Sequence, residues 1–291
     1  MPASQELQDK ISEITNLPTL PSVAARLMKI VNDPITSSTD VAFVVGQDLS
    51  LSAKVLRLAN SAFYGMPRTI TNINNAVVIL GLRVINTMVL SITVFDMFPD
   101  DKKKALFNRD AFWKHSLACG LICKILASRT KKFVLFDPEE AFCAGLLHDV
   151  GKVAMEQYLH DDFRKALAFA KKNTISSVEA EQRTLGYTHA DVADWLTAAW
   201  ELPVELHAPL VYHHKPSETT SCADAVALCH YADFLCYQSG LSIDEGFAAP
   251  MLDTKAIESL RITPDDVEYV NQILPDEMKK MKVFFDLAGS R

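Results

Sequence analysis

The side chains that could do chemistry in this sequence are histidines and aspartates with metal-binding character. His148 and Asp149 are adjacent, follow an apolar run, and are followed shortly by Gly151 and Lys152. Imidazole nitrogen and carboxylate oxygen together suit Fe, Mn, Zn or Ni rather than a metal that prefers thiolates. The candidate ligands, in chain order, are His115, His148, Asp149, His189, His213, His214 and Asp233. We therefore expect one or two divalent transition-metal ions (Fe, Mn, Ni or Zn).

Such a metal centre would suit the hydrolysis of a phosphoester. A bound divalent ion offers a positive centre to the phosphate and activates water, since Zn-bound water titrates near pH ~7 rather than ~15.7. Asp149, next to a histidine at a helix end, can also bridge to a second ion. Lys152 lies four residues after His148, so on a continued helix the two share a face. Its ammonium could then contact a phosphate oxygen, which makes Asp149 and Lys152 the candidate catalytic residues.

Several of these residues also have simpler explanations. His115 could be an ordinary core or surface histidine, and His189 could cap the start of a helix. His213 and His214 precede Lys215-Pro216, so one of the pair could face solvent, and Asp233 could be a solvated acid. The histidines at positions 160, 207 and 230 fall outside the ordered pattern. The one at 230, three residues before Asp233, could still support a ligand.

The six cysteines form no CxxC pair, so we expect them to be reduced and mostly buried. Cys222, Cys229 and Cys236 recur every seven residues, which places them on one helix stripe. At a rise of ~1.5 Å per residue, they are about 10 Å apart along the axis and cannot share one ion. Cys119 and Cys123 are likewise interpreted as core residues.

The elements that must position these residues are predicted to be helices. Residues 21–31 have one apolar face, and Ser37 has capping-box spacing to Asp40. Ser50 can cap the next helix. Residues 72–94 give one or two apolar helices, with Gly81 marking either a close helix contact or a break.

The helix that carries the His-Asp pair has a clear predicted start. Asp137 can cap it, Pro138 suits the first helical position, and two acids follow. It should end near His148, after which Gly151 allows a turn or a kink. Ser176 or the serine after it can start another helix. With no convincing strand pattern, the sequence predicts an all-α fold.

Several separated motifs resemble one known family. The ligand order is similar to that of the HD superfamily of metal-dependent phosphohydrolases. The segments that resemble its HDOD branch (HD-related output domain) are LPTLP at 17–21, VLRLANSAFYG at 55–65, AVVILG at 76–81, WELP at 200–203 and HHKP at 213–216. The resemblance covers roughly residues 14 to 240. It implies a helical bundle with an N-terminal helical lobe.

The resemblance also implies roles for the candidate ligands. In the superfamily, the positions of His115, His148, Asp149 and Asp233 hold one metal, and in dinuclear members those of His189, His213 and His214 hold a second. Members that hydrolyse cyclic dinucleotides carry a Gly-Tyr-Pro signature after the HH pair, and this chain lacks it. The HDOD branch implies a regulatory protein of bacterial signal transduction with a retained metal site. The alternative is an active phosphohydrolase on a nucleotide or other phosphoester.

Composition limits the partners. A net charge of -7 argues against nucleic-acid binding. The region 38–60 has the outline of a helix-turn-helix but carries only Lys54 and Arg57. No signal peptide or membrane span is expected, so we predict a cytoplasmic protein. We expect protein signalling partners, and possible ligands that contain phosphate. Residues 1–105 are predicted to form the N-terminal lobe, 106–240 the metal-binding core and 241–291 a C-terminal helical extension.

Overall fold

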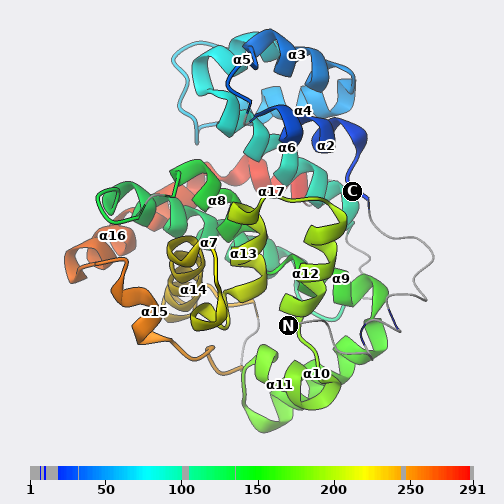
Figure 1. Ribbon diagram of the computed structural model, residues 1–291, viewed down its shortest axis with the longest axis vertical. Coiled ribbons are helices and arrows are strands. Elements are labelled where there is room, and N and C mark those ends of the chain that lie inside the picture. The colour runs from blue at the N-terminus through cyan, green and yellow to red at the C-terminus, as the bar shows by residue number, and fades with distance from the viewer. Residues whose placement is uncertain are drawn as a thin grey trace. The chain divides into compact units, whose positions relative to one another are not determined.

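The computed structural model is built from helices (Figure 1). It describes residues 7, 10, 19–31, 33–99, 105–134, 136–243 and 247–288. Leu17 and Pro18, which open the first family-like motif, lie outside these residues. Within the described ranges there is no β-strand, which confirms the predicted all-α class. No helix among the described residues is both long and apolar enough to cross a bilayer.

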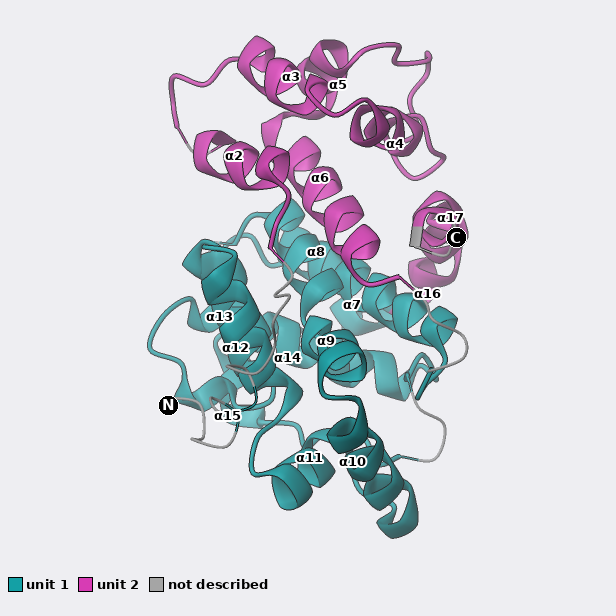
Figure 2. Ribbon diagram, turned by 90° about the vertical axis from the view of Figure 1, so that its right-hand side faces the viewer, with its two compact units in different colours: residues 1–18, 101–270 teal, residues 19–100, 271–291 magenta. Residues whose placement is uncertain are grey.

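The chain divides into two compact units, which are coloured separately in Figure 2. Unit 1 contains residues 1–18 and 101–270, and unit 2 contains residues 19–100 and 271–291. All seven candidate metal ligands belong to unit 1.

Unit 2 packs around one apolar helix. Its helices are α2 (Ser22–Val31), α3 (Ser38–Gly46), α4 (Leu49–Ala59), α5 (Ile73–Leu80), α6 (Leu82–Met97) and α17 (Lys282–Ala288). Helix α6 contacts α2, α4, α5 and α17, and most of its residues are buried. Gly81 separates α5 from α6 with a φ of 93°, a backbone conformation that favours glycine. Of the two predicted alternatives, the structure therefore has two helices with a break.

The helix starts in unit 2 follow from their capping residues. Ser37 and Asp40 form the predicted capping box of α3. The cap of α4 is Asp48, which accepts from the Leu51 amide, so the prediction of Ser50 was wrong. The helix therefore begins two residues earlier than a Ser50 cap would place it.

The basic residues of α4 are engaged within unit 2. Lys54 Nζ lies 2.6 Å from Asp96, and Arg57 lies 3.0 Å from Asp286. Each cation is thus partly neutralised by an acid, which agrees with the expectation that α4 is not a DNA-recognition helix. That expectation stays a prediction.

Unit 1 is organised around α7. Its elements are α7 (Arg109–Arg129), α8 (Pro138–Leu147), α9 (Val150–Tyr158), α10 (His160–Asn173), α11 (Ser177–Leu185), α12 (His189–Ala199), α13 (Val204–Tyr212), the 3-10 turn η1 (Pro216–Glu218), α14 (Ala223–Gln238), α15 (Thr254–Glu258) and the first part of α16 (Pro264–Lys280). Helix α7 packs against α8 and α14, while α12 packs against α9 and α13.

One glycine controls how closely two of these helices approach. A Cβ built on Gly151 would lie 1.9 Å from the carbonyl oxygen of His189, far inside contact distance. Gly151 is therefore required for α9 to lie against the start of α12. Its role is close packing rather than the turn or kink predicted from sequence, and it brings the chain after Asp149 beside His189.

Candidate metal centre

The His148-Asp149 pair occupies a junction between two helices. Asp137 caps α8 by accepting from the amides of Glu139 and Glu140, as predicted. The helix ends at Leu147, and α9 begins at Val150. The two potential ligands thus lie where the chain changes direction, and their side chains point into the interior of unit 1. His148 and Asp149 are 0% and 1% exposed.

Lys152 reaches the centre differently from the sequence prediction. The helix does not continue from His148, so the two residues do not share one helix face. Instead the Lys152 ammonium donates to Asp149 Oδ2 over 2.8 Å, and both side chains are buried. The lysine therefore contacts a candidate metal ligand directly.

Asp149 Oδ2 faces the first group of candidate ligands. The Nε2 atoms of His148 and His115 lie 3.3 Å and 3.7 Å from this oxygen. His115 Nε2 also lies 3.2 Å from Asp233 Oδ1 and 3.3 Å from His148 Nε2. Helices α7 and α14 and the α8–α9 junction thus direct two imidazoles and two carboxylates to one point.

Asp149 Oδ1 faces the second group. His189 Nε2 lies 3.1 Å from this oxygen, and His213 Nε2 lies 3.7 Å from it. His214 Nε2 is 3.0 Å from His189 Nε2. The ligand atoms of His115, His148 and Asp149 lie within 4.8 Å of one another, as do those of the second group, and Asp149 belongs to both sets. Asp233 Oδ1 joins the first group through its distances of 3.2 Å to His115 Nε2 and 3.8 Å to His148 Nε2. The structure therefore brings all seven predicted residues together, in two groups that share one carboxylate.

Hydrogen bonds behind the rings determine which nitrogens face the centre. His115 Nδ1 lies 2.8 Å from the Leu241 carbonyl oxygen, and His148 Nδ1 lies 2.7 Å from that of Gly145. A carbonyl oxygen only accepts, so Nδ1 must carry the proton in each ring. The Nε2 atom of each neutral ring then has a lone pair. Two such lone pairs at 3.3 Å, beside carboxylates, form a cluster of acceptors that requires a cation.

The second group has the same property. His213 Nδ1 is directed at backbone carbonyls, 3.2 Å from those of Pro209 and Leu210. Its Nε2 atom and Asp149 Oδ1 are buried without a hydrogen-bond partner. Unpaired buried acceptors cost folding free energy unless something binds them. Imidazole nitrogen and carboxylate oxygen fit a divalent transition metal.

The electrostatics of the centre also favour cation binding. Burial alone would raise the pKa of Asp149, but the Lys152 ammonium and His148 hold it well below its usual range. Burial lowers the pKa of His213 to about 4, so this ring stays neutral. Burial alone would lower the pKa of His148, but Asp149 raises it to about 10. In the absence of metal, a proton on His148 thus supplies charge that a bound ion would replace.

Glu181 is a residue of the centre that sequence reasoning missed. It lies on α11 and is fully buried. One of its oxygens accepts from His189 Nδ1 over 2.6 Å and from the His189 amide over 2.8 Å. A carboxylate behind a histidine fixes the ring and its tautomer, as in many metal sites. The predicted start of α11 at Ser176 was correct, but no sequence spacing pointed from Glu181 to His189.

We predict that Glu181→Gln weakens metal binding by the second group. Removing such an outer carboxylate typically costs about 10–100-fold in metal affinity. Titration of metal-free protein with Mn²⁺ or Zn²⁺ measures the change. Glu179→Gln is the matched control, because Glu179 lies on the same helix but its side chain is 42% exposed and paired with Arg183. Equal affinities for the two variants would rule out this role for Glu181.

The three remaining histidines are not candidate ligands, and one of them, His230, contacts the backbone of a candidate ligand. His230 donates from Nδ1 to the His213 carbonyl over 2.6 Å, and its Nε2 accepts from the Asp253 amide. It thus holds the backbone of the candidate ligand His213, the supporting role that its position near Asp233 had suggested. His160 and His207 contact other residues, Glu156 and Thr197.

The thiols of Cys119 and Cys123 meet that of Cys229 between α7 and α14, within 4.8 Å of one another. The sequence spacing did not reveal this group. Burial raises the pKa of Cys119 and Cys123 well above the usual range, so these thiols stay protonated. The thiolate is the metal-binding form. The group therefore packs as part of the core, as expected for Cys119 and Cys123.

Comparison with known proteins gives consistent matches. Residues 17–216 match the HDOD domain family. An uncharacterized protein of Treponema pallidum (strain Nichols) is 25% identical over 204 residues, which cover 69% of this chain but only 38% of that protein. The crystal structure of an HDOD domain protein of unknown function from Geobacter sulfurreducens is 26% identical, with a TM-score of 0.76 and coverage of 97% and 96% of the two chains. A proposed phosphohydrolase from Shewanella amazonensis SB2B is 23% identical, with a TM-score of 0.70 and coverage of 99% and 98%.

Proposed function

Since this chain belongs to the HDOD domain family, we propose that it is a regulatory protein of signal transduction whose unit 1 holds a metal centre. The observation that carries the proposal is the position of Asp149. Its two oxygens face two separate groups of imidazole nitrogens, and one of those oxygens is buried without a hydrogen-bond partner. An ordinary core has no reason to gather so many acceptors.

The proposed ligands divide between two ions. His115, His148, Asp149 and Asp233 would hold the first, and His189, His213 and His214 would hold the second together with Asp149. Such ions supply Lewis acidity toward a phosphate and lower the pKa of water. Lys152 would keep Asp149 ionised and place a positive charge at the centre, while Glu181 and His230 would position His189 and His213.

The proposed route of signalling is a protein contact. The net charge of the chain is -7, and the two basic residues of α4 are paired with acids. Neither feature favours the phosphate backbone of a nucleic acid. We propose that the protein acts in the cytoplasm and binds protein partners there.

A second candidate function, metal-dependent hydrolysis of a nucleotide or other phosphoester, is favoured by Lys152. Its ammonium is buried at the centre, beside a shared carboxylate, where it could bind a phosphate oxygen. The sequence after His214 is Lys215-Pro216, without the Gly-Tyr-Pro signature of cyclic-dinucleotide phosphodiesterases. Hydrolysis of cyclic dinucleotides is therefore the least favoured reaction.

One experiment separates the two functions. Elemental analysis establishes the metal content, and a panel of nucleotides and bis(p-nitrophenyl) phosphate is then assayed with added Mn²⁺ or Fe²⁺. The regulatory proposal predicts bound metal and no turnover above background. Hydrolysis predicts turnover that Lys152→Ala lowers roughly ten- to hundredfold, the loss of one charge-assisted hydrogen bond, with metal content retained. Lys172→Ala is the control, because Lys172 is an exposed residue of α10.

Metal-dependent turnover at rates above that of free metal would overturn the purely regulatory function. Turnover that Lys152→Ala leaves unchanged would instead refute the role of Lys152 while the metal assignment stands.

A further inference from the structure

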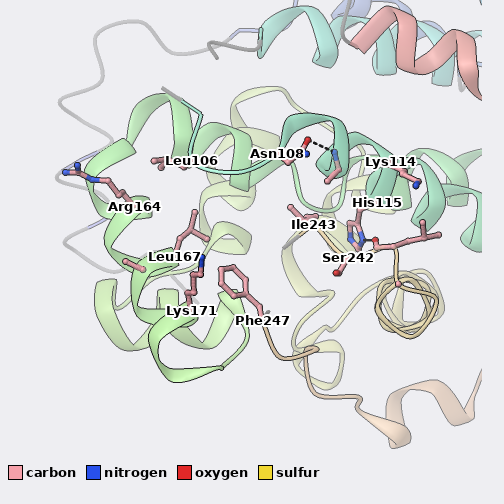
Figure 3. Close-up of a pocket in the computed structure, with 14 residues that line it drawn as sticks. Leu106, Asn108, Lys114, His115, Arg164, Leu167, Lys171, Ser242, Ile243 and Phe247 are labelled. Atoms are coloured by element: carbon pink, nitrogen blue, oxygen red, sulfur yellow. Dashed lines mark hydrogen bonds between the residues drawn. The ribbon is translucent and has the colours of Figure 1, made fainter. Parts of the chain in front are cut away.

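A cavity of about 700 Å³ lies in unit 1, beside the metal centre but separate from it (Figure 3). Its walls come from three parts of the chain: the start of α7 with the residues just before it, one face of α10, and residues 240–243 and Phe247 after α14. A volume of this size is in the range of pockets for small organic ligands. No residue of the metal centre except His115 lines it.

The ring of His115 separates the cavity from the centre. His115 Nε2 faces His148 and Asp233, whereas Nδ1 is bonded to the carbonyl oxygen of Leu241. Leu241 itself lines the cavity. The cavity therefore lies on the Nδ1 side of the ring, and the candidate metal ligands lie on the other.

The charge of the cavity contrasts with that of the chain. Its lining includes Lys114, Arg164 and Lys171 and no acidic residue, although the chain as a whole carries a net charge of -7. Arg164 is paired with Asp161 at the surface. Within the described part of the chain, no hydrogen bond or ion pair engages Lys114 or Lys171. Two ammonium groups are thus available to an anion.

The rest of the lining is apolar. Leu106 and Leu167 lie on one side, and Ile243 and Phe247 come from the segment after α14. Figure 3 shows the Phe247 ring beside Lys171. An aromatic ring that enters the cavity would contact aliphatic side chains and a phenyl ring, while an attached anionic group would reach the lysines.

We propose that this cavity binds a small aromatic anion, at a site separate from the metal centre. The proposal depends on neither bound metal nor hydrolysis. In a regulatory protein, a ligand bound here would lie one side chain away from the metal centre. It could affect the centre through the hydrogen bond between the Leu241 carbonyl oxygen and His115.

The test uses two dyes of nearly equal shape. 8-Anilinonaphthalene-1-sulfonate carries an anionic group, and N-phenyl-1-naphthylamine lacks it. Both are titrated by fluorescence against the full chain in EDTA, so that the metal centre plays no part. We expect the sulfonate to bind more tightly, with one molecule per chain.

Charge variants test the lysines. Lys114→Glu combined with Lys171→Glu should weaken binding of the sulfonate roughly tenfold or more, because two charge attractions become repulsions. Binding of the neutral dye should change less than about twofold. Lys172→Glu is the matched control, since it is the next residue on α10, is exposed and lies outside the lining.

A steric variant tests the location. Ala168 is exposed on α10 and lines the cavity, so Ala168→Trp should narrow the cavity without disturbing the core and weaken binding of both dyes. The proposal is overturned if the double lysine variant binds the sulfonate as tightly as wild type. It is equally overturned if Lys172→Glu weakens binding as much, or if Ala168→Trp leaves the affinity for both dyes unchanged.

Discussion

Asp149→Ala is expected to leave the protein essentially free of metal. Wild-type protein incubated with Mn, Fe, Ni or Zn and then desalted should retain at least one equivalent, measured by elemental analysis. The variant should fall below about a tenth of an equivalent, because loss of a direct ligand costs more than the 10–100-fold typical of an outer partner. Asp149 alone belongs to both ligand groups, so its removal affects both positions.

Two further aspartates make the result specific. Asp233→Ala should affect only the group that contains His115 and His148, and should therefore lower metal content less than Asp149→Ala does. Asp191→Ala removes one half of the capping box at the start of α12, near His189, but no candidate ligand, so it should keep the metal. Retention of metal by Asp149→Ala, or equal loss in Asp191→Ala, would contradict the assignment.

Lys152→Met is expected to destabilise the metal-free protein by about 3–5 kcal/mol. Breaking a buried ion pair by removing one partner leaves an uncompensated buried charge, and this is the usual cost. Lys152 Nζ lies 2.8 Å from Asp149 Oδ2, and the side chains are 5% and 1% exposed. Methionine keeps most of the volume. Saturating Mn²⁺ should recover much of the loss, because a bound cation compensates Asp149 instead.

Urea unfolding followed by tryptophan fluorescence measures this change in unit 1. All three tryptophans, Trp113, Trp195 and Trp200, lie in that unit. Lys165→Met is the control, since Lys165 is 68% exposed, pairs with Asp162 and should cost no more than about 1 kcal/mol. If Lys152→Met in EDTA costs no more than this control, the buried pair does not hold Asp149 as described.

The starts of some helices could be predicted from the sequence, because their capping residues have few other roles. Asp137 and Pro138 mark the start of α8, and the Ser37-Asp40 spacing marks that of α3. The choice of Asp48 over Ser50 at α4 could not be predicted, because both can cap and tertiary packing decides which one does. The role of Gly81 could not be decided for the same reason, because its sequence context allows either a close helix contact or a helix break.

The candidate centre could be predicted from residue types but not in its details. The ordered histidines and aspartates meet in space as the family resemblance implied, although metal binding by them stays a prediction. Glu181 could not be found, because it depends on how α11 lies against the start of α12. The ion pair of Lys152 was likewise hidden, since it depends on α8 ending at Leu147.

Features formed by segments far apart in the sequence could not be predicted. The cavity joins the start of α7, part of α10 and the chain after α14, and no periodicity relates them. The meeting of Cys119 and Cys123 with Cys229 also depends on how α7 packs against α14. The packing role of Gly151 could not be predicted either, because it depends on the close approach of α9 to the start of α12.

The central claim is that Asp149 joins two ligand groups around bound metal, and anomalous X-ray diffraction tests it most directly. Crystals of protein incubated with Mn, Fe, Ni or Zn would be measured at the absorption edge of each metal. The account predicts at least one anomalous peak about 2.0–2.2 Å from an Asp149 oxygen and from a histidine Nε2 of the same group. If both ligand groups bind an ion, one anomalous peak should lie beside each of the two Asp149 carboxylate oxygens. Crystals that show no anomalous peak at Asp149 after incubation with all four metals would contradict it.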